Sequence, residues 1–384
     1  MLQGAGDSTD LEIARLAKLR LADYERERRA AAEKLGVRAP ILDKLVSAAR
    51  PPDESVPGQG RKLELAEPEP WPAPVDGAAL VGELEAAVER YVILPKGGAF
   101  AVTLWVMLAH CFDGFPCTPR LAITAPEKRC GKTTLLDVVG QLVPRPLSTG
   151  SITAAALFRT IELASPVLLI DEADTFLGDN EELRGVLNQG HRRGGQIIRT
   201  AGDDYEPRIF NVYAPVAIAT IGRLPGTIAD RSIHIEMRRA SKSERVAKFR
   251  LGKTPELGVL ARKAARWVRD NAEAIRNHEP MIPDAIYNRA AANWEPLLTI
   301  AEIAGAAVAD RARAAALAAC GREEEQSLGT LLLGDIRDVF AEREIDRLAS
   351  AELVEALAAM PERPWPECRN GKPINQNWLA RPAA

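Results

Sequence analysis

The chain has 384 residues, which is enough for two or three domains with well-buried cores. Apolar residues make up 46% of it and charged residues 27%, as in ordinary globular proteins. Fifty basic and 53 acidic side chains leave a formal charge of −3, so any nucleic-acid site has to be a local basic patch.

Targeting and redox features point to a cytoplasmic chain. Its five cysteines show neither metal-ligand spacing nor a disulfide framework. The first ten residues lack the charged and then apolar pattern of a signal peptide. The longest apolar run, residues 99–112, is interrupted by His110 and is too short to span a bilayer. We therefore expect no secretion, no disulfides and no association with membranes.

Residues 1–50 are predicted to form a separate helical unit. The phrase AAEKLGVRAPILDKLV has helix–turn–helix spacing, because Gly36 can end one helix and another can start near Pro40. Residues 11–50 carry more basic than acidic side chains, and the unit is interpreted either as a protein-docking module or as a DNA-binding one. Residues 51–76 are rich in proline and in acidic side chains and are predicted to be an extended linker.

Strand-like and helical runs alternate from residue 77 to residue 240. The expected elements are helices at 78–91 and 99–112 and strands at 120–124, 167–170 and 215–221. This alternation predicts an α/β domain with a largely parallel sheet over residues 77–240. Residues 241–325 are almost wholly helical and are expected to form a lid, and residues 326–384 a small C-terminal helical domain.

The most informative segment, PEKRCGKTT, occupies residues 126–134 between the strand RLAIT and the apolar helix LLDVVGQL. A strand, a loop ending in Gly-Lys-Thr and a helix together predict a phosphate-binding loop for ATP. Backbone N–H groups of such a loop point at the phosphates, and Gly131 lets the backbone approach closely. Lys132 is expected to supply a cation to the β- and γ-phosphates, and Thr133 a hydroxyl to Mg²⁺. The predicted nucleotide contacts are Glu127, Lys128, Arg129, Cys130, Gly131, Lys132, Thr133 and Thr134.

The loop departs from the usual GxxxxGK[ST] pattern at two positions. Pro126 replaces the first glycine, and Arg129 stands where many such loops have a second one. Cys130 is interpreted as a small loop residue and not as a nucleophile.

A second motif, VLLIDEADTFL at residues 167–177, ends a buried strand in two carboxylates. In a parallel sheet the carboxyl ends of the strands share one edge, so Asp171 and Glu172 are expected near the phosphate loop. Asp171 is predicted to bind Mg²⁺ and Glu172 to polarise the attacking water, which favours hydrolysis over binding alone. The alternative is a pair of solvated turn residues. Asp174 is expected to cap a helix.

The segment 188–222 is predicted to contain a basic loop, followed by a hairpin with its turn at residues 202–204. Positive charge concentrates here at Arg192, Arg193 and Arg199. These arginines are expected either to face DNA or a neighbouring subunit, or to be solvated and paired with nearby carboxylates.

Two further residues are placed by the strands that they adjoin. Thr220 ends a core strand, where a polar sensor of the γ-phosphate is expected. Arg231 lies between a helix and the strand SIHIEM. In ring ATPases an arginine at such a junction reaches the nucleotide of the neighbouring subunit and neutralises developing charge there. A structural salt bridge is the alternative for Arg231.

These motifs resemble a known family, the domain of unknown function found at the C-terminal end of primase/helicase-like proteins of phages, plasmids and integrated elements. The resemblance is carried by the phrases PRLAITAPEKRCGKTTLLDVV, VLLIDEADTFL, LNQGHRRGGQIIR, ADRSIHIEMRR and NRAAANWEPLLTIAEIAG, together with AAEKLGVRAPILDKLV nearer the N-terminus. The order of the motifs is similar to that of AAA+ and superfamily-three helicases, which implies that residues 77–240 form a P-loop ATPase core of the AAA+ kind.

The resemblance implies a DNA helicase or translocase that uses ATP and Mg²⁺ and works as a homo-oligomeric ring in the replication of a mobile element. The implied partners are single-stranded or forked DNA and a primase or initiator of the same element. Two alternatives remain: a regulatory or assembly ATPase that acts on a protein partner, and a DNA-binding initiator that ATP only switches. No primase-like segment precedes the linker, so priming itself is not expected.

Overall fold

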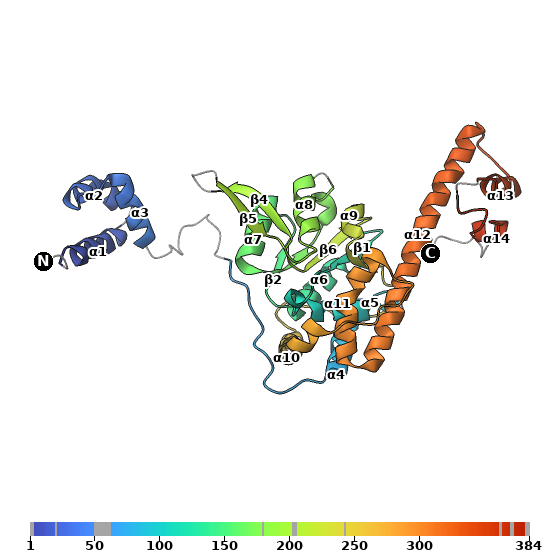
Figure 1. The fold of residues 1–384 in the computed structure, drawn as a ribbon, viewed down its shortest axis with the longest axis horizontal. Helices are drawn as coiled ribbons and strands as arrows, with labels where there is room; N and C mark the ends of the chain where they lie inside the picture. The colour runs from blue at the N-terminus through green and yellow to red at the C-terminus, as the bar shows by residue number, and fades with distance from the viewer. Residues whose placement is uncertain are drawn as a thin grey trace. The chain divides into compact units, whose positions relative to one another are not determined.

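The computed structural model describes residues 4–19, 21–49, 63–178, 180–201, 206–241, 243–360, 363–368 and 372–380. The chain divides into two compact units, residues 1–64 and residues 65–384 (Figure 1). Each unit has its own hydrophobic core. Among the described helices, none combines the length and the apolar character that crossing a membrane requires.

The first unit contains three helices, α1 (Gly4–Ala17), α2 (Leu21–Lys34) and α3 (Ala39–Ala49). Leu16, Leu42 and Val46 are fully buried among them. Asp43 on α3 accepts a hydrogen bond from the Tyr24 hydroxyl at 2.8 Å and pairs with Arg28, so its carboxylate is used inside the unit. The other side of α3 is exposed and largely apolar, with Ile41 and Leu45 among its exposed side chains. Lys44 is exposed between them, so this side of α3 offers both apolar and basic groups.

The second unit is built on a parallel sheet of five strands, which confirms the predicted mixed α/β class. The strands are β1 (Arg120–Ala125), β2 (Pro146–Thr149), β3 (Val167–Ile170), β6 (Val216–Ile221) and β7 (Ser232–Glu236). Their spatial order is β2-β3-β6-β1-β7. The chain therefore moves from β1 to one side of the sheet, returns through β6, and crosses over β1 to add β7 on the other side. The short, half-exposed β2 has no apolar run and was not predicted from the sequence.

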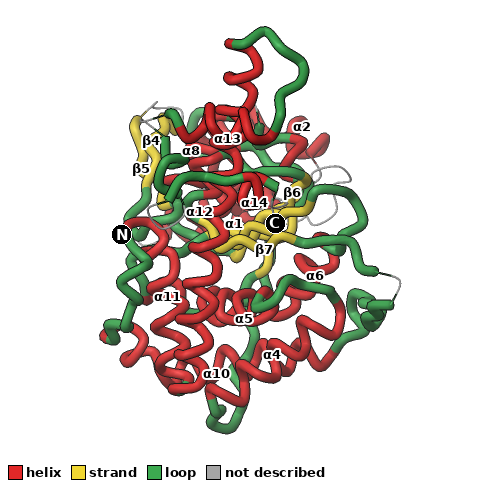
Figure 2. Tube along the Cα trace, turned by 90° about the vertical axis from the view of Figure 1, so that its right-hand side faces the viewer, coloured by secondary structure: helices red, strands yellow, loops and turns green. Residues whose placement is uncertain are grey.

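Helices cover both faces of the sheet, because successive strand residues point to opposite sides. Leu121 and Ile123 face one core and Ala122 faces the other. The first face is covered by α4 (Gly77–Tyr91), α5 (Gly98–Ala109), α6 (Lys132–Leu142), α10 (Pro255–Asn277) and α11 (Asn288–Ala304). The second is covered by α7 (Ala154–Ala164), α8 (Glu181–Gln189) and α9 (Gly226–Ala229). In Figure 2, α8 lies on the side of the sheet away from α4, α5 and α10.

The helices that follow residue 241 share the core of the sheet. Leu257 and Trp267 of α10 and Leu297 and Ile300 of α11 are buried in the same cluster as β1 and α6. The segment that was expected to form a lid is thus packed into the main body at these two helices. After the long helix α12 (Ala306–Glu342) come α13 (Ser350–Ala358) and α14 (Gln376–Leu379), which have a small core of their own around Trp365.

Residues 65–76 run over the surface of the second unit, although the sequence predicted them to be part of a linker. The main-chain oxygen of Ala66 accepts from the N–H of Arg145, whose guanidinium pairs with Glu67 at 2.8 Å. Trp71 donates its N–H to the Arg262 oxygen at 2.9 Å, and the Arg262 guanidinium lies over its ring. An extended, proline-rich segment leaves its carbonyls unpaired, and here arginine side chains satisfy them.

A buried arginine joins the beginnings of two strands to a helix end. Arg120, the first residue of β1, is 1% exposed and donates to the main-chain oxygens of Ala214 and Leu187, each at 2.6 Å. Burial lowers its pKa to about 9. Its side chain thus fixes the end of α8 and the approach to β6 against β1, at the amino edge of the sheet.

Candidate functional site

The residues at and after the ends of three strands lie together at one edge of the sheet. β1, β6 and β3 are parallel neighbours, so the loop 126–131, Thr220 and the pair Asp171–Glu172 all lie at the carboxyl edge. The order of the strands reverses beside β1, and in open α/β sheets such a reversal opens a crevice outside the carboxyl ends. The predicted site residues of these three motifs therefore share one location.

The loop after β1 turns into α6 through two residues with left-handed backbone. Gly131 has φ +86° and forms the N-cap of α6, a left-handed conformation that favours glycine. A Cβ there would also lie 3.4 Å from Cε of Met237. Arg129 takes φ +67° as well, so the loop makes two left-handed turns before the helix begins. The first N–H groups of α6 have no partner within the helix and face this loop.

The side chains of the loop leave its outer surface open. Glu127, Lys128 and Arg129 are exposed, whereas the Cys130 thiol is buried and donates to the Glu127 oxygen at 3.3 Å. This is the place of a small packing residue, as expected. Lys132 starts α6, and its Nζ lies 3.5 Å from the same Glu127 oxygen.

The two motifs meet at the start of α6. Thr133 Oγ1 donates to Asp171 Oδ2 at 2.7 Å, and the N–H of Glu172 donates to Asp171 Oδ1 at 2.8 Å. A cavity of about 190 Å³ lies beside this pair, lined by Thr133, Leu136, Asp137, Ser148, Thr149, Gly150, Leu169 and Asp171. Burial and the nearby Asp171 raise the pKa of Asp137. A hydroxyl and a carboxylate in contact are oxygen ligands that fit Mg²⁺, which takes one or two carboxylates and completes its shell with phosphates and water.

Unlike Asp171, which accepts two hydrogen bonds, Glu172 has a side chain that makes none among the described residues. Its backbone is left-handed, with φ +51° and ψ +38°, and the Thr175 hydroxyl donates to its carbonyl at 2.8 Å. The side chain is exposed, and within the described residues its carboxylate has no hydrogen-bond or ion-pair partner. A non-glycine residue in this region costs roughly 1–3 kcal/mol, and such strain is frequent at functional sites.

Asp174 and Thr220 bind each other across the edge of the sheet. Asp174 Oδ1 accepts from the N–H of Ile221 at 3.1 Å and from Thr220 Oγ1 at 3.4 Å. Asp174 thus holds the end of β6, and the prediction that it caps a helix was wrong: the 3-10 turn Ala173–Thr175 has Glu172 at its N-cap position. Thr220 is 2% exposed, and its hydroxyl is engaged by protein groups.

Arg231 lies at the opposite edge of the sheet. It immediately precedes β7, and its main-chain oxygen accepts from the N–H of Arg120 at the start of β1. Its guanidinium donates to the Thr227 oxygen at 2.6 Å. Burial, together with the positive charges of Arg289 and Arg192, lowers its pKa. Arg231 is therefore separated from Lys132 of its own chain by the length of β1.

The structure does not gather the three arginines of the predicted basic loop. Arg192 and Arg193 are exposed at the amino edge, where Arg193 donates its N–H to the Pro116 oxygen. Arg199 lies on β4 (Gln196–Ala201), which pairs antiparallel with β5 (Glu206–Asn211), and it forms an ion pair with Glu182 at 2.8 Å. The expected hairpin is thus formed by β4 and β5, while its turn at 202–204 lies outside the described residues.

A buried polar chain at the amino edge was not predicted. His191 Nε2 lies 2.9 Å from Asn293 Oδ1, and Asn293 Nδ2 donates to the Asp230 oxygen at 3.1 Å. His191 and Asn293 are 3% and 4% exposed. The single sequence signal was Asn293 on the apolar face of a helix, in the phrase NRAAANWEP. Asn293 joins α11 to the loop that carries Arg231 and to the segment before the hairpin.

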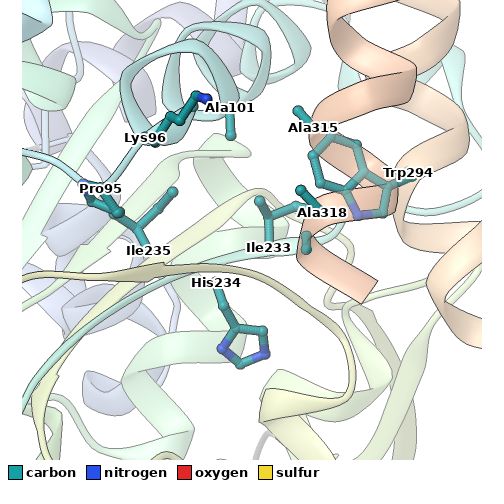
Figure 3. Close-up of a pocket in the computed structure, with 12 residues that line it drawn as sticks. Pro95, Lys96, Ala101, Ile233, His234, Ile235, Trp294, Ala315 and Ala318 are labelled. Carbon is teal, nitrogen blue, oxygen red and sulfur yellow. The ribbon is translucent and has the colours of Figure 1, made fainter. Parts of the chain in front are cut away.

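A second hollow lies on the far side of β7 from β1. It is about 40 Å³ in volume and is enclosed by the start of α5, by α11 and by α12. In Figure 3, Ile233 and Ile235 point into it together with Ala101 and Ala315, while His234 points the other way. A space of this size and apolar lining does not fit a nucleotide.

Comparison with known families finds a match to the C-terminal part of the chain. Residues 236–382 match a family described as "Protein of unknown function (DUF3631)". The matched range contains all of the phrase NRAAANWEPLLTIAEIAG but begins after the phosphate loop and the acidic pair. The similarity that the sequence suggested for most of the chain is therefore shown for its C-terminal part.

Two further relatives were found. An uncharacterized 28.9 kDa protein in the xis 5′ region of Saccharopolyspora erythraea is 38% identical over 134 residues, which make up 34% of this chain and 49% of that protein. The chain thus spans about half the length of this curated relative. A solved structure, the apo A form of the NrS-1 C-terminal region, covers 62% of this chain and 55% of its own, at 13% identity and a TM-score of 0.35. At that TM-score the likeness carries no structural argument.

The buried His191 predicts a pH-dependent stability. Burial, and next the charge of Arg120, lower its pKa from 6.5 to about 4. Between these values the unfolded chain binds a proton that the folded chain does not, so the free energy of unfolding falls as the pH drops from 6.5 to 4. One such histidine contributes at most about 1.4 kcal/mol per pH unit.

Urea titrations at several pH values measure this slope. His191→Gln, which keeps a donor for Asn293, is expected to lose one histidine's share of it and to retain the share of His110, whose pKa burial also lowers to about 4. An unchanged slope in a folded His191→Gln variant would contradict the assignment.

Proposed function

We propose that the chain is an ATP-hydrolysing motor with a P-loop core, working as a DNA helicase or translocase in the replication of a phage, plasmid or integrated element. The observation that carries the proposal is the 2.7 Å hydrogen bond between Thr133 Oγ1 and Asp171 Oδ2. It joins the helix after the glycine-lysine-threonine loop to the acidic strand end, although β6 lies between β1 and β3. A nucleotide and its cation need both groups at this distance from each other.

ATP would bind outside the end of β1. The N–H groups of residues 127–134 and the positive end of α6 favour phosphate oxygens at this place. The Lys132 ammonium, which now lies 3.5 Å from a carbonyl of the loop, would exchange that weak contact for the β- and γ-phosphates. Thr133 and Asp171 would hold Mg²⁺, which when bound neutralises charge on the phosphates.

Glu172 is the residue proposed to act on water. It is next to the cation ligand Asp171, is exposed, and has no described partner for its carboxylate. A carboxylate so placed can accept a hydrogen bond from a water molecule and orient it toward the γ-phosphate. The left-handed backbone at Glu172 changes the direction of the chain after β3, immediately after the proposed Mg²⁺ ligand Asp171.

Arg231 is proposed to act on the nucleotide of a neighbouring copy. The six residues of β1 separate it from its own phosphate loop by about 20 Å. A guanidinium is planar, permanently charged and able to bind two phosphate oxygens at once. The carboxyl edge has basic groups of its own, since Arg239 after β7 pairs with Glu127 of the loop at 3.8 Å. In a closed ring of copies, Arg231 would add a guanidinium from the neighbouring chain.

The hairpin supports contact with a partner molecule. Arg199 and Arg208 face each other across the two strands, as do Ile198 and Ile209, which are 62% and 60% exposed. A ribbon that exposes basic and apolar side chains fits single-stranded nucleic acid. The exposed isoleucine pair also fits a protein partner, and it favours the second candidate function, an ATPase that remodels a protein.

Two variants separate nucleotide binding from hydrolysis. Lys132→Ala removes the phosphate cation and is expected to weaken ATP binding at least tenfold, because a charged hydrogen bond is worth about 1.5–3 kcal/mol. Glu172→Gln is expected to keep ATP bound and to lower kcat by a factor on the order of 10² or more. Equilibrium binding of a fluorescent ATP analogue and steady-state ATPase rates measure the two effects.

Lys253→Ala, which changes an exposed lysine outside both motifs, is the matched control and should alter neither quantity. ATP hydrolysis by Glu172→Gln at the wild-type rate would show that another group orients the water.

Single-stranded DNA discriminates the two candidate functions. A helicase or translocase is expected to hydrolyse ATP several-fold faster when single-stranded DNA is added, because the DNA is its track. Arg199→Ala combined with Arg208→Ala should lower the salt dependence of DNA binding by about one to two units. The control Arg337→Ala changes an arginine paired with Asp338 on α12 and should leave that slope unchanged.

DNA-independent hydrolysis by the wild-type chain would favour the protein-remodelling ATPase. Tight ATP binding with no turnover, with or without DNA, would instead favour a nucleotide-switched initiator.

A further inference from the structure

Three arginines from separate parts of the chain lie together at the amino edge of the sheet. Arg231 precedes β7, Arg192 follows α8, and Arg289 is the second residue of α11. Arg289 pairs with Asp230 at 2.9 Å, and Asp230 is the residue before Arg231. These side chains form what we call the amino-edge cluster, Arg192, Asp230, Arg231 and Arg289.

Backbone contacts bring Arg192 to the same place. Arg192 forms a β-bridge with Cys117, and the Cys117 thiol donates to the main-chain oxygen of Ala292 on α11 at 2.8 Å. Ala292 is less than one helical turn from Arg289. Arg192 therefore approaches α11 from one side while Asp230 approaches it from the other.

Asn293 positions the cluster from beneath. It lies one turn after Arg289 on α11, and its amide bonds both His191, the neighbour of Arg192, and the main chain of Asp230. The three segments that carry Arg192, Arg231 and Arg289 are thus connected through the buried amide of Asn293. A buried polar group without a hydrogen-bond partner lowers the stability of the fold, so this amide strongly favours one arrangement of the three segments.

The amino-edge cluster contains more positive than negative charge. Asp230 is its single carboxylate against three guanidiniums. In the part of the chain that the structure describes, neither Arg192 nor Arg231 has a carboxylate oxygen within 4 Å, and Arg231 is bonded to a main-chain oxygen instead. Like charges held close together repel, and a bound anion would relieve that repulsion.

We infer that the amino-edge cluster is one binding site for the phosphate oxygens of an ATP molecule held by a second copy of this chain, with Arg192 and Arg289 acting beside Arg231. The inference rests on the proposed function and extends it to two residues, one of them on α11. The ligand cannot be the chain's own nucleotide, because β1 lies between the two edges of the sheet. Three guanidiniums on one edge match a triphosphate, the most densely charged ligand that the proposed function supplies.

The test compares four forms of the full chain: wild type, Arg289→Ala, Arg289→Lys and the control Arg269→Ala. Arg269 is an exposed arginine of α10 paired with Asp270, away from the cluster. Arg289→Ala is expected to lower kcat about tenfold or more, while binding of a fluorescent ATP analogue and the unfolding midpoint stay close to wild type. Arg269→Ala should behave as wild type.

Arg289→Lys separates a phosphate contact from a structural ion pair. Lysine can still pair with Asp230, but it lacks the planar fork that binds two phosphate oxygens. The inference predicts that kcat stays low in Arg289→Lys. Full recovery of both kcat and stability by lysine would overturn it, because that result is expected of a salt bridge alone.

Mixing two inactive forms tests whether the contact acts between copies. Arg289→Ala retains Glu172, and Glu172→Gln retains the whole amino-edge cluster. In a closed ring of both at equal amounts, about a quarter of the interfaces pair an intact site with an intact cluster, so activity should partly return. No recovery, with mixed oligomers shown to form, would overturn the inference.

Two further outcomes are distinguishable. If Arg192→Ala and Arg289→Ala each lower the salt slope of DNA binding by about one unit without affecting kcat, the cluster binds DNA and the inference is wrong. If the wild-type chain binds ATP but never hydrolyses it, the proposed function fails, and assembly in a non-hydrolysable ATP analogue still tests the inference. Sedimentation velocity should then show weaker assembly for Arg289→Ala than for wild type, and equal assembly would overturn it.

Discussion

The contact between Thr133 and Asp171 depends on the parallel arrangement of the five strands. Since β1, β6 and β3 all run in one direction, the segments that follow them share an edge, and residues 38 positions apart in the chain come within 2.7 Å. Gly131 contributes to the close approach, because its left-handed backbone turns the loop 126–131 into the start of α6. Every group of the candidate site is placed by these two constraints.

The parallel arrangement also places the acidic pair and the amino-edge arginines at opposite edges of the sheet. The carboxyl edge holds the loop 126–131, Asp171 and Glu172, whereas the amino edge holds the amino-edge cluster. Arg120 and Asn293, both buried, fix the amino edge through hydrogen bonds to main-chain oxygens of several segments. Under the proposed function, a copy of the chain would offer a nucleotide site on one edge and arginines for a neighbour's phosphates on the other, as hydrolysis shared between neighbours requires.

Patterns of neighbouring residues predicted much of the fold and of the candidate site, whereas contacts between distant segments were not predicted. The loop 126–131, the acidic pair and four of the five strands follow from short sequence phrases, because each depends on neighbouring residues. Residues 65–76 were predicted to be part of a linker, because the arginines that bind them are distant in the sequence. One of these arginines immediately precedes β2 and another lies on α10. The division of Arg192 and Arg193 from Arg199, the role of Asp174, and the pairing of Asn293 with His191 all require knowing which segments the fold brings together. The one short-range signal among them is Asn293 on the apolar face of its helix, and it does not identify His191 as the partner.

The most direct test of the account is a crystal structure of the full chain with Mg²⁺ and a non-hydrolysable ATP analogue. The account predicts the triphosphate at the N–H groups of residues 127–134, with Lys132 Nζ moved from the Glu127 oxygen to the phosphates. It also predicts the cation between Thr133 and Asp171, in place of the hydrogen bond that now joins them. A nucleotide bound elsewhere, or an intact Thr133–Asp171 hydrogen bond and an empty loop at saturating nucleotide, would contradict the account.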